Sequence, residues 1–283
     1  MASLTVTSDI DEDPASYVPQ CGTVLRQFDH RTQDSGNVSW LVESEGRPLF
    51  VKTAGTPQPA RGAPTPHLDH TARVGLLRNA IQLARSCTHP ALPTLLNVIE
   101  SPAGPVLVYE AATGELVGVP SERRGDPASP YQRFAHLPAP TLLGLFDTLV
   151  DLHVALAAAG WVAGDLYDGC LIVDFETPGL RVVDLDSYRR GAGTNDMGRM
   201  FGSTRFMAPE ELELGAAVDE RTTVHTLARI VWHFATRLTE ERSQFCGSNA
   251  LAQVLATACR SRPDDRHASV ADFGRAWFAA RQA

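Results

Sequence analysis

The single lysine of this chain is the side chain whose chemistry stands out first. Of the 25 basic residues, 24 are arginine and one, Lys52, is lysine. The preference for arginine indicates GC-rich coding and says nothing of function, but it makes the exception informative. Arginine presents a rigid planar fork, whereas lysine carries a compact ammonium charge on a flexible stem. We therefore expect that Lys52 has a task that requires an ammonium group.

Further charged residues lie where expected helices and strands end. Asp165, in GDLYDGCLIV, follows an expected long helix and precedes a short apolar strand, and Asp184, in VVDLD, comes directly after the next strand. The segment FGSTRFMAPEE follows at residues 201–211, and Arg266 lies near the end of the sequence. The order and spacing of these residues form the most specific pattern in the chain.

This pattern resembles the signature set of protein kinases, in which a strand lysine precedes two aspartates and an APE motif. Asp165 lies 19 residues before Asp184, and Asp184 lies 26 residues before Glu210. The closest match is GSTRFMAPE at residues 202–210, which resembles the GTxxYMAPE that closes a kinase activation segment. The resemblance covers residues 20 to 280, and the chain is similar to a divergent bacterial Ser/Thr protein kinase.

The resemblance implies ATP and Mg²⁺ as cofactors and a role for each matching residue. Lys52 would contact the α- and β-phosphates, Asp165 would orient an acceptor hydroxyl and take its proton, and Asp184 would hold Mg²⁺. Phosphoryl transfer concentrates negative charge, so such a site must supply cations and in-line positioning. We expect these three side chains to meet in one crevice between two lobes.

Other implied residues surround this centre. Ser203 would support Asp165 from the segment that contacts a protein substrate. Glu210 and Arg266 would form a buried ion pair that braces the larger lobe, and losing one partner would cost several kcal/mol because the other charge stays buried. The resemblance also implies that Gly36 and Val38 bind ATP. Tyr109, Glu110 and Ala111 would form the hinge that faces the adenine.

The lobe that would bind ATP departs from the family pattern. The segment RTQDSGNV keeps one glycine, Gly36, where the family has three, and close backbone approach to phosphates depends on glycine. The expected helix over residues 71–86 contains no Asp or Glu, so the glutamate that pairs with the strand lysine in the family is missing. We expect Lys52 to pair with Asp184 instead, or with the phosphates of ATP.

The catalytic loop, HRDLKxxN in the family, reads AGDLYDGC here. Tyr167 replaces the lysine, and Cys170 replaces the magnesium-binding asparagine with a soft ligand poorly suited to Mg²⁺. Asp168 is a candidate for the compensating oxygen. DFG becomes Asp184-Leu185-Asp186, and Asp186 is either a second metal ligand or a turn or cap residue. The predicted metal ligands are therefore Asp184, Asp186, Asp168 and Cys170.

Two other replacements concern the position and control of the loop. Thr223 stands where the family has a buried aspartate that ties down the catalytic loop. Gly164 stands beside Asp165, where activation by phosphorylation normally uses an arginine. Thr194 and Ser203 are therefore poor candidates for a phosphorylation switch.

The elements that must position these residues form a mixed α+β pattern. Residues 21–53 alternate as strands with a hairpin-like turn at Glu45-Gly46, and an amphipathic helix and two more strands complete a small sheet that ends near Glu110. A long apolar helix, two short strands at 171–173 and 180–183, and further helices follow. The predicted architecture is a bilobal protein-kinase fold with a small β-rich lobe and a larger α-helical one. The predicted parts are a flexible tail (1–18), an N-lobe (19–110) and a C-lobe (111–283).

Composition limits the other classes of protein. The net charge of −8 argues against nucleic acid or anionic membrane as the main partner. The apolar stretch over 141–164 is interrupted by Asp147, Asp151 and His153, which favours a buried helix over a membrane span. Five scattered cysteines without a CxxC pair and a polar, acidic start without a secretory signal predict a cytoplasmic location.

Three functions stay open. The first is an ATP-dependent kinase that transfers the γ-phosphate to a Ser or Thr hydroxyl, favoured by Lys52, Asp165 and Asp184. The second is a pseudokinase that acts as a nucleotide-binding or scaffold module, favoured by Cys170 and the missing glycines. The third is a small-molecule kinase, although such enzymes usually lack a segment like GSTRFMAPE. The phosphoryl acceptor is unknown.

Overall fold

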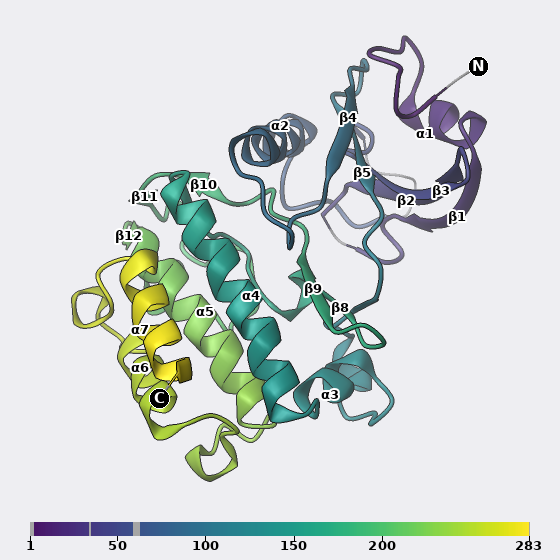
Figure 1. Cartoon of the computed structure of the whole chain (residues 1–283). Helices are drawn as coiled ribbons and strands as arrows, with labels where there is room; N and C mark the ends of the chain where they lie inside the picture. Colours follow the sequence, from purple (N-terminus) through teal and green to yellow (C-terminus); the bar gives the residue numbers. More distant parts are fainter. Residues whose placement is uncertain (1–2, 34, 59–62, 283) are drawn as a thin grey trace. The chain divides into compact units, whose positions relative to one another are not determined.

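The computed structural model of the chain describes residues 3–33, 35–58 and 63–282. They form two compact units (Figure 1). The N-terminal unit holds the residues up to Ser86 together with Pro93–Ala112, and the C-terminal unit holds Cys87–Leu92 and the residues from Thr113 onward. The chain passes into the C-terminal unit after Ala112, close to the lobe boundary predicted after residue 110.

A five-stranded antiparallel sheet of order β1-β2-β3-β5-β4 and one long helix make up most of the N-terminal unit. The hairpin between β2 and β3 turns at Glu45 and Gly46, whose φ angles are 54° and 76°. Two positive φ angles are typical of the type I′ turn that joins adjacent antiparallel strands, as the sequence predicted. The elements are β1 (Thr23–Phe28), β2 (Val38–Ser44), β3 (Arg47–Thr53), α2 (His70–Ser86), β4 (Leu95–Ile99) and β5 (Val106–Glu110).

The first residues of the chain are packed onto this sheet. Leu4 is fully buried in the same cluster as Trp40 and Val51, and Tyr17, the last residue of the short helix α1 (Pro14–Tyr17), is buried with them. The side chain of Asn97 on β4 donates hydrogen bonds to the carbonyl oxygens of Leu4 and Thr7, at 2.9 and 2.7 Å. Leu4, Tyr17 and Val18 are therefore part of the core, whereas the sequence analysis assigned residues 1–18 to a flexible tail, because apolar residues spaced this widely give no periodic signal.

The C-terminal unit is mostly helical. Its longer helices are α3 (Pro130–Ala135), α4 (Ala139–Ala158), α5 (Glu220–Ala235), α6 (Asn249–Ala258) and α7 (Val270–Gln282). A three-stranded sheet of order β6-β8-β9 is built from Glu115–Leu116, Leu171–Asp174 and Gly179–Val182. Two small ladders pair β10 (Arg189–Arg190) with β7 (Trp161–Val162), and β11 (Gly193–Thr194) with β12 (Ala217–Val218).

Helix α4 is the centre of the C-terminal unit. By length and composition it is apolar enough to cross a membrane, but α5 and α7 lie alongside it (Figure 1) and its Leu and Phe side chains are buried there. Its charged residues have partners within the unit. Asp147 accepts hydrogen bonds from Trp277 and Arg281, at 2.7 and 2.8 Å, and Asp151 lies 3.1 Å from His89. These contacts explain why charged residues interrupt an otherwise apolar helix.

The order of elements agrees with the predicted fold class. A five-stranded antiparallel sheet comes first, and a mostly helical region follows it, so the protein is a mixed α+β structure. The short strands predicted at 171–173 and 180–183 correspond to β8 and β9.

Candidate functional site

Lys52 lies in the N-terminal unit, on the central strand β3 between β2 and β5. It is paired with Ser39 on β2 and with Leu107 on β5. Residues that oppose one another across a ladder share a face of the sheet, and Leu107 packs in the cluster with Leu77 and Ile81 of α2. The half-buried Lys52 side chain therefore starts on the face of the sheet that α2 covers.

The predicted glycine loop is packed against the loop that follows β3. Gly36 has a φ of +79°, and a Cβ atom there would lie 2.5 Å from Pro66. A Cβ on Gly55 would lie 2.3 Å from the carbonyl oxygen of Gly36. Val38 begins β2, and its carbonyl oxygen accepts a hydrogen bond from the Thr53 hydroxyl at 2.9 Å. The remaining glycine is therefore needed for close packing within the unit. Asp34 of the same segment lies outside the described residues.

Tyr109, Glu110 and Ala111 lie at the end of β5, where the sequence predicts a hinge. The N–H group of Glu110 donates to the carbonyl oxygen of Thr94 at 3.0 Å, and that of Ala111 donates to Pro48 at 3.3 Å. These two backbone donors are thus used within the N-terminal unit rather than presented to an adenine.

Asp165 and Asp184 are brought together within the C-terminal unit, on the loops after β7 and β9. Their φ angles are 56° and 62°, in the left-handed region that residues other than glycine rarely adopt. Backbone strain of this kind concentrates at functional sites. Both carboxylates lie close enough to Cys170 and Tyr167 to raise the pKa of each, after burial itself, which is the largest cause.

Cys170 does not have the character of a metal ligand. Its side chain is buried, and its thiol donates a hydrogen bond to the carbonyl oxygen of Asp165 at 3.2 Å. Burial and the neighbouring carboxylates raise the pKa of this thiol well above its ordinary value, so it stays protonated at neutral pH. A metal ligand must be a thiolate, so the metal role predicted for Cys170 is not supported by its surroundings.

Asp168, the predicted compensating ligand, is instead bound to an arginine. Its carboxylate is buried, and both of its oxygens accept hydrogen bonds from Nη2 of Arg205, at 2.9 and 3.0 Å. A metal ion there would have to displace this guanidinium from a buried carboxylate. The structure therefore gives Asp168 an ion-pairing role, and metal ligation at this residue stays a prediction.

The two aspartates of the DLD sequence differ in exposure. Asp186 is buried, at 7% exposed, whereas Asp184 is exposed to solvent. Among the described residues, no group of three or more His, Cys, Asp or Glu side chains is placed to hold a metal ion. Magnesium usually keeps several waters and takes only one or two carboxylates together with the phosphates of a nucleotide. The predicted set of four ligands does not assemble among the described residues, and the exposed Asp184 is a carboxylate of the kind that such a site needs.

The predicted catalytic loop is held in place by Thr223, which stands where protein kinases have a buried aspartate. The hydroxyl oxygen of Thr223 on α5 is buried and accepts a hydrogen bond from the N–H of Ala163 at 2.9 Å. The next residue, Gly164, lies against the backbone, because a Cβ there would come 2.3 Å from the carbonyl oxygen of Ser187. A short hydroxyl therefore fixes the loop, and no larger side chain fits beside Asp165.

The segment FGSTRFMAPEE reaches the same loop. A Cβ on Gly202 would lie 3.6 Å from Oδ1 of Asp165, so this glycine borders the aspartate directly. The neighbouring Ser203 hydroxyl accepts a hydrogen bond from Nε of Arg205 at 3.2 Å. The predicted substrate platform is thus adjacent to the predicted catalytic aspartate.

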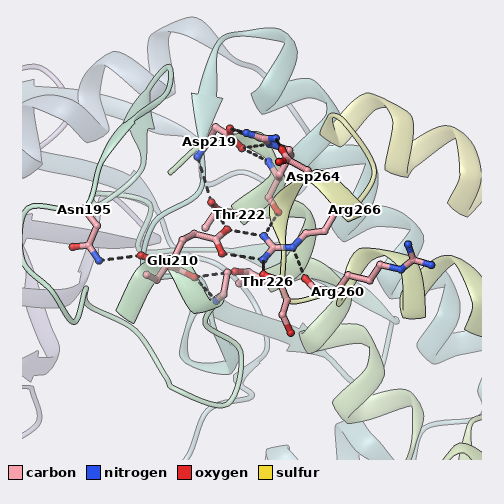
Figure 2. A network of polar contacts seen from close by, with 12 residues as sticks. Asn195, Glu210, Asp219, Thr222, Thr226, Arg260, Asp264 and Arg266 are labelled. Carbon is pink, nitrogen blue, oxygen red and sulfur yellow. Dashed lines mark hydrogen bonds and ion pairs between the residues drawn. The ribbon is translucent and has the colours of Figure 1, made fainter. Parts of the chain in front are cut away.

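The predicted ion pair between Glu210 and Arg266 is present (Figure 2). Nη1 and Nη2 of Arg266 bind the two carboxylate oxygens at 2.6 and 2.9 Å, and Thr222 donates to Oε1 at 2.8 Å. Burial alone would raise the pKa of Glu210, but these hydrogen bonds and the arginine charge outweigh burial and lower the pKa. The arginine also donates to the carbonyl oxygens of Arg260, Ser261 and Arg221, so the buried charges are fully engaged.

Sequence reasoning missed the partners of Arg205. This arginine also donates to the hydroxyl of Tyr131 at 2.9 Å, and that hydroxyl lies 2.5 Å from Nε2 of His233. Nδ1 of His233 in turn lies 2.5 Å from Glu240. The sequence held one signal for the contact between Arg205 and Asp168. It was an acidic residue in the predicted catalytic loop together with an arginine inside the APE segment.

The comparisons with known proteins name no relative. No protein-family model matches the chain, and no curated protein matches it at a significant level of similarity. The geometry of these residues is therefore the basis for any statement about function.

Proposed function

We propose that this chain is a phosphotransferase of the bilobal protein-kinase fold that binds ATP and transfers its γ-phosphate to a hydroxyl group. The observation that carries the proposal is that Asp165 and Asp184, on two loops with left-handed backbone angles, both lie close to Cys170 and Tyr167, and that Gly202 of the APE segment borders Asp165. The Glu210–Arg266 ion pair stabilises the end of that segment, where Glu210 lies.

In this proposal each residue acts on a stated atom. Asp165 takes the proton of the acceptor hydroxyl while the oxygen of that hydroxyl bonds to the γ-phosphorus. The bond between the γ-phosphorus and the oxygen that bridges it to the β-phosphate breaks, and ADP leaves. Lys52 contributes an ammonium charge toward the α- and β-phosphates. Mg²⁺, when bound with the nucleotide, would reduce the negative charge on the phosphates, and Asp184 would hold it.

The acceptor that we propose is a hydroxyl of a protein. The segment GSTRFMAPE, which in kinases faces the protein substrate, is retained, and it borders Asp165. A small-molecule acceptor is the alternative, and a transfer assay with protein and small-molecule acceptors in parallel distinguishes the two.

A pseudokinase is the second candidate function. The observation that favours it is the replacement of two cationic or magnesium-binding positions by Tyr167 and by the protonated thiol of Cys170. Under this reading the chain binds nucleotide, or a partner, without transferring phosphate.

The first experiment is a thermal-shift titration with ATP, in the presence and absence of Mg²⁺. A ligand that binds the folded state raises the melting temperature by mass action. We expect a magnesium-dependent increase that is lost in Lys52→Ala and Asp184→Asn and kept in Asp126→Asn, an aspartate of the same unit as Asp184 whose side chain is 42% exposed. Absence of any nucleotide effect on the unmodified protein would contradict ATP binding.

The second experiment separates the enzyme from the pseudokinase. Transfer of radiolabelled γ-phosphate should require Asp165, so Asp165→Asn should lose transfer while it keeps the ATP-dependent thermal shift. Lys52→Arg should also lose transfer, because a chain with 24 arginines has kept an ammonium group here. ATP binding by the unmodified protein without transfer to any acceptor would favour the pseudokinase.

A further inference from the structure

The contact between Arg205 and Asp168 links two segments that are 37 residues apart in sequence. Asp168 belongs to the catalytic loop, three residues after Asp165, and Arg205 belongs to the APE segment, three residues after Gly202. The Asp168 side chain is 2% exposed and the Arg205 side chain 24% exposed. The ion pair therefore closes a loop of chain that runs from Asp168 to Arg205, each three residues beyond Asp165 and Gly202 respectively.

The arginine has further partners on both sides of this contact. Its Nε donates to the hydroxyl of Ser203, within its own segment, and its Nη1 donates to the hydroxyl of Tyr131 on α3. The ring of Phe206 lies 4.8 Å from the guanidinium carbon, and the carbonyl oxygen of Arg205 accepts a hydrogen bond from Arg229 on α5 at 3.3 Å. The side chain is thus held in one orientation by groups from three parts of the C-terminal unit.

The surroundings of Asp165 explain why such a contact is needed. Gly164 leaves no space for a side chain, because a Cβ there would meet the carbonyl oxygen of Ser187. The residue before the aspartate therefore provides no cation to which the APE segment could be tied. A hydrogen bond between an ionised guanidinium and a carboxylate is stronger than one between neutral groups, and here it runs from Nη2 of Arg205 in the APE segment to both oxygens of Asp168 in the loop.

We propose that Arg205 and Asp168 are positioning residues, which hold residues 202–205 beside Asp165 so that the acceptor hydroxyl is presented to its carboxylate. The inference rests on the proposed function for its catalytic meaning. The mechanical part, that this ion pair orders the segment, stands on the contacts alone. Neither residue touches the reacting atoms, and both act through the position of Gly202 and Ser203.

The test measures the order of the segment without any nucleotide. Backbone hydrogen exchange of residues 199–208 is compared between the unmodified protein and the variants Arg205→Gln, Asp168→Asn and Arg205→Lys. Arg133→Gln is the control, since Arg133 also pairs with an acidic residue, Glu115, in the same unit but away from the segment. We expect exchange to accelerate about tenfold in the first two variants, less in Arg205→Lys, and not in the control.

Two further readings make the result decisive. Exchange in helix α4 should stay unchanged, which shows that a variant is folded, and Arg205→Lys is the fallback if Arg205→Gln unfolds. For a protein that transfers phosphate, the variants should raise KM for the acceptor and lower kcat while KM for ATP stays constant. Unchanged exchange at 199–208 in folded variants would overturn the inference. A protein that shows the exchange effect but no transfer would contradict only the proposed function.

Discussion

The N-terminal unit buries an arginine among main-chain carbonyl groups, whereas the C-terminal unit buries carboxylates against arginines. Arg73 on α2 is 4% exposed and donates to the carbonyl oxygens of Ala54, Thr56 and Leu68 at 2.7 to 2.9 Å. In the C-terminal unit, Glu210 and Asp168 are each paired with a guanidinium group.

This difference has an energetic meaning. A carbonyl group is neutral, so removing Arg73 leaves unpaired dipoles but no unpaired charge. Removing the partner of a buried carboxylate leaves a full charge in a poorly solvated place, which costs much more. Glu210 and Asp168 should therefore be more sensitive to the loss of a partner, and they belong to the unit that also holds Asp165 and Asp184.

The largest effect is expected for Arg266→Ala. Loss of the guanidinium leaves Glu210 buried without its partner, so the free energy of unfolding should fall by about 3–5 kcal/mol. Urea denaturation followed by tryptophan fluorescence measures it, since Trp161 and Trp277 are buried in this unit. The control is Arg262→Ala, an exposed arginine nearby, which should change little. A loss below about 1 kcal/mol for Arg266→Ala would show that Glu210 finds another partner or a proton.

The next effect depends on pH and concerns Glu211. Burial is the main cause that raises the pKa of this carboxyl to about 7, with a smaller contribution from Glu210. Its ordinary value is 4.5, so between pH 4.5 and 7 the unfolded chain loses the proton while the folded protein keeps it. Stability should therefore fall as pH rises through this range and stay low above it.

Glu211→Gln should remove this dependence. The amide oxygen can still accept the hydrogen bond from the N–H of Ala208 but carries no charge, so the variant should gain on the order of 2 kcal/mol at pH 8 and nothing at pH 4. Denaturation curves at the two pH values measure the gain. An equal change at both would mean that packing, rather than ionisation, accounts for it.

A smaller effect is expected for Arg73→Met in the N-terminal unit. The three carbonyl groups lose their donor, but they are neutral and Thr56 is exposed, so the loss should be about 1–2 kcal/mol. Trp40 is buried in this unit and reports its unfolding by fluorescence. A loss as large as that of Arg266→Ala would remove the contrast between the two units.

The smallest effect is expected for Arg78→Ala. Arg78 and Glu100 form a bidentate pair in the N-terminal unit, but their side chains are 52% and 51% exposed. Solvent screening leaves such pairs a contribution of about 0–1 kcal/mol. The same fluorescence titration should show a change within that range, and a larger one would mean that the pair also fixes the end of β4.

Local patterns in the sequence were enough for much of the fold. Alternating residues predicted β2 and β3, the Glu45-Gly46 pair predicted their turn, and helical spacing predicted α2. The sequence placed Asp165 between the long helix and a short strand and Asp184 directly after the next strand, and the resemblance to protein kinases implied the Glu210–Arg266 pair. These features depend on residues that are close in sequence, or on the order of motifs that this chain shares with the protein-kinase signature set.

The sequence by itself determined which residues carry charge, where strands and helices run, and that one lysine stands alone among arginines. Only the tertiary structure decided what those charges do. Asp168 is paired with Arg205, Cys170 is buried and donates to the carbonyl oxygen of Asp165, and Thr223 holds the loop through Ala163. The physical reason is that pairing, burial and pKa depend on neighbours that folding brings together from distant parts of the chain, and periodicity along the sequence carries no record of them.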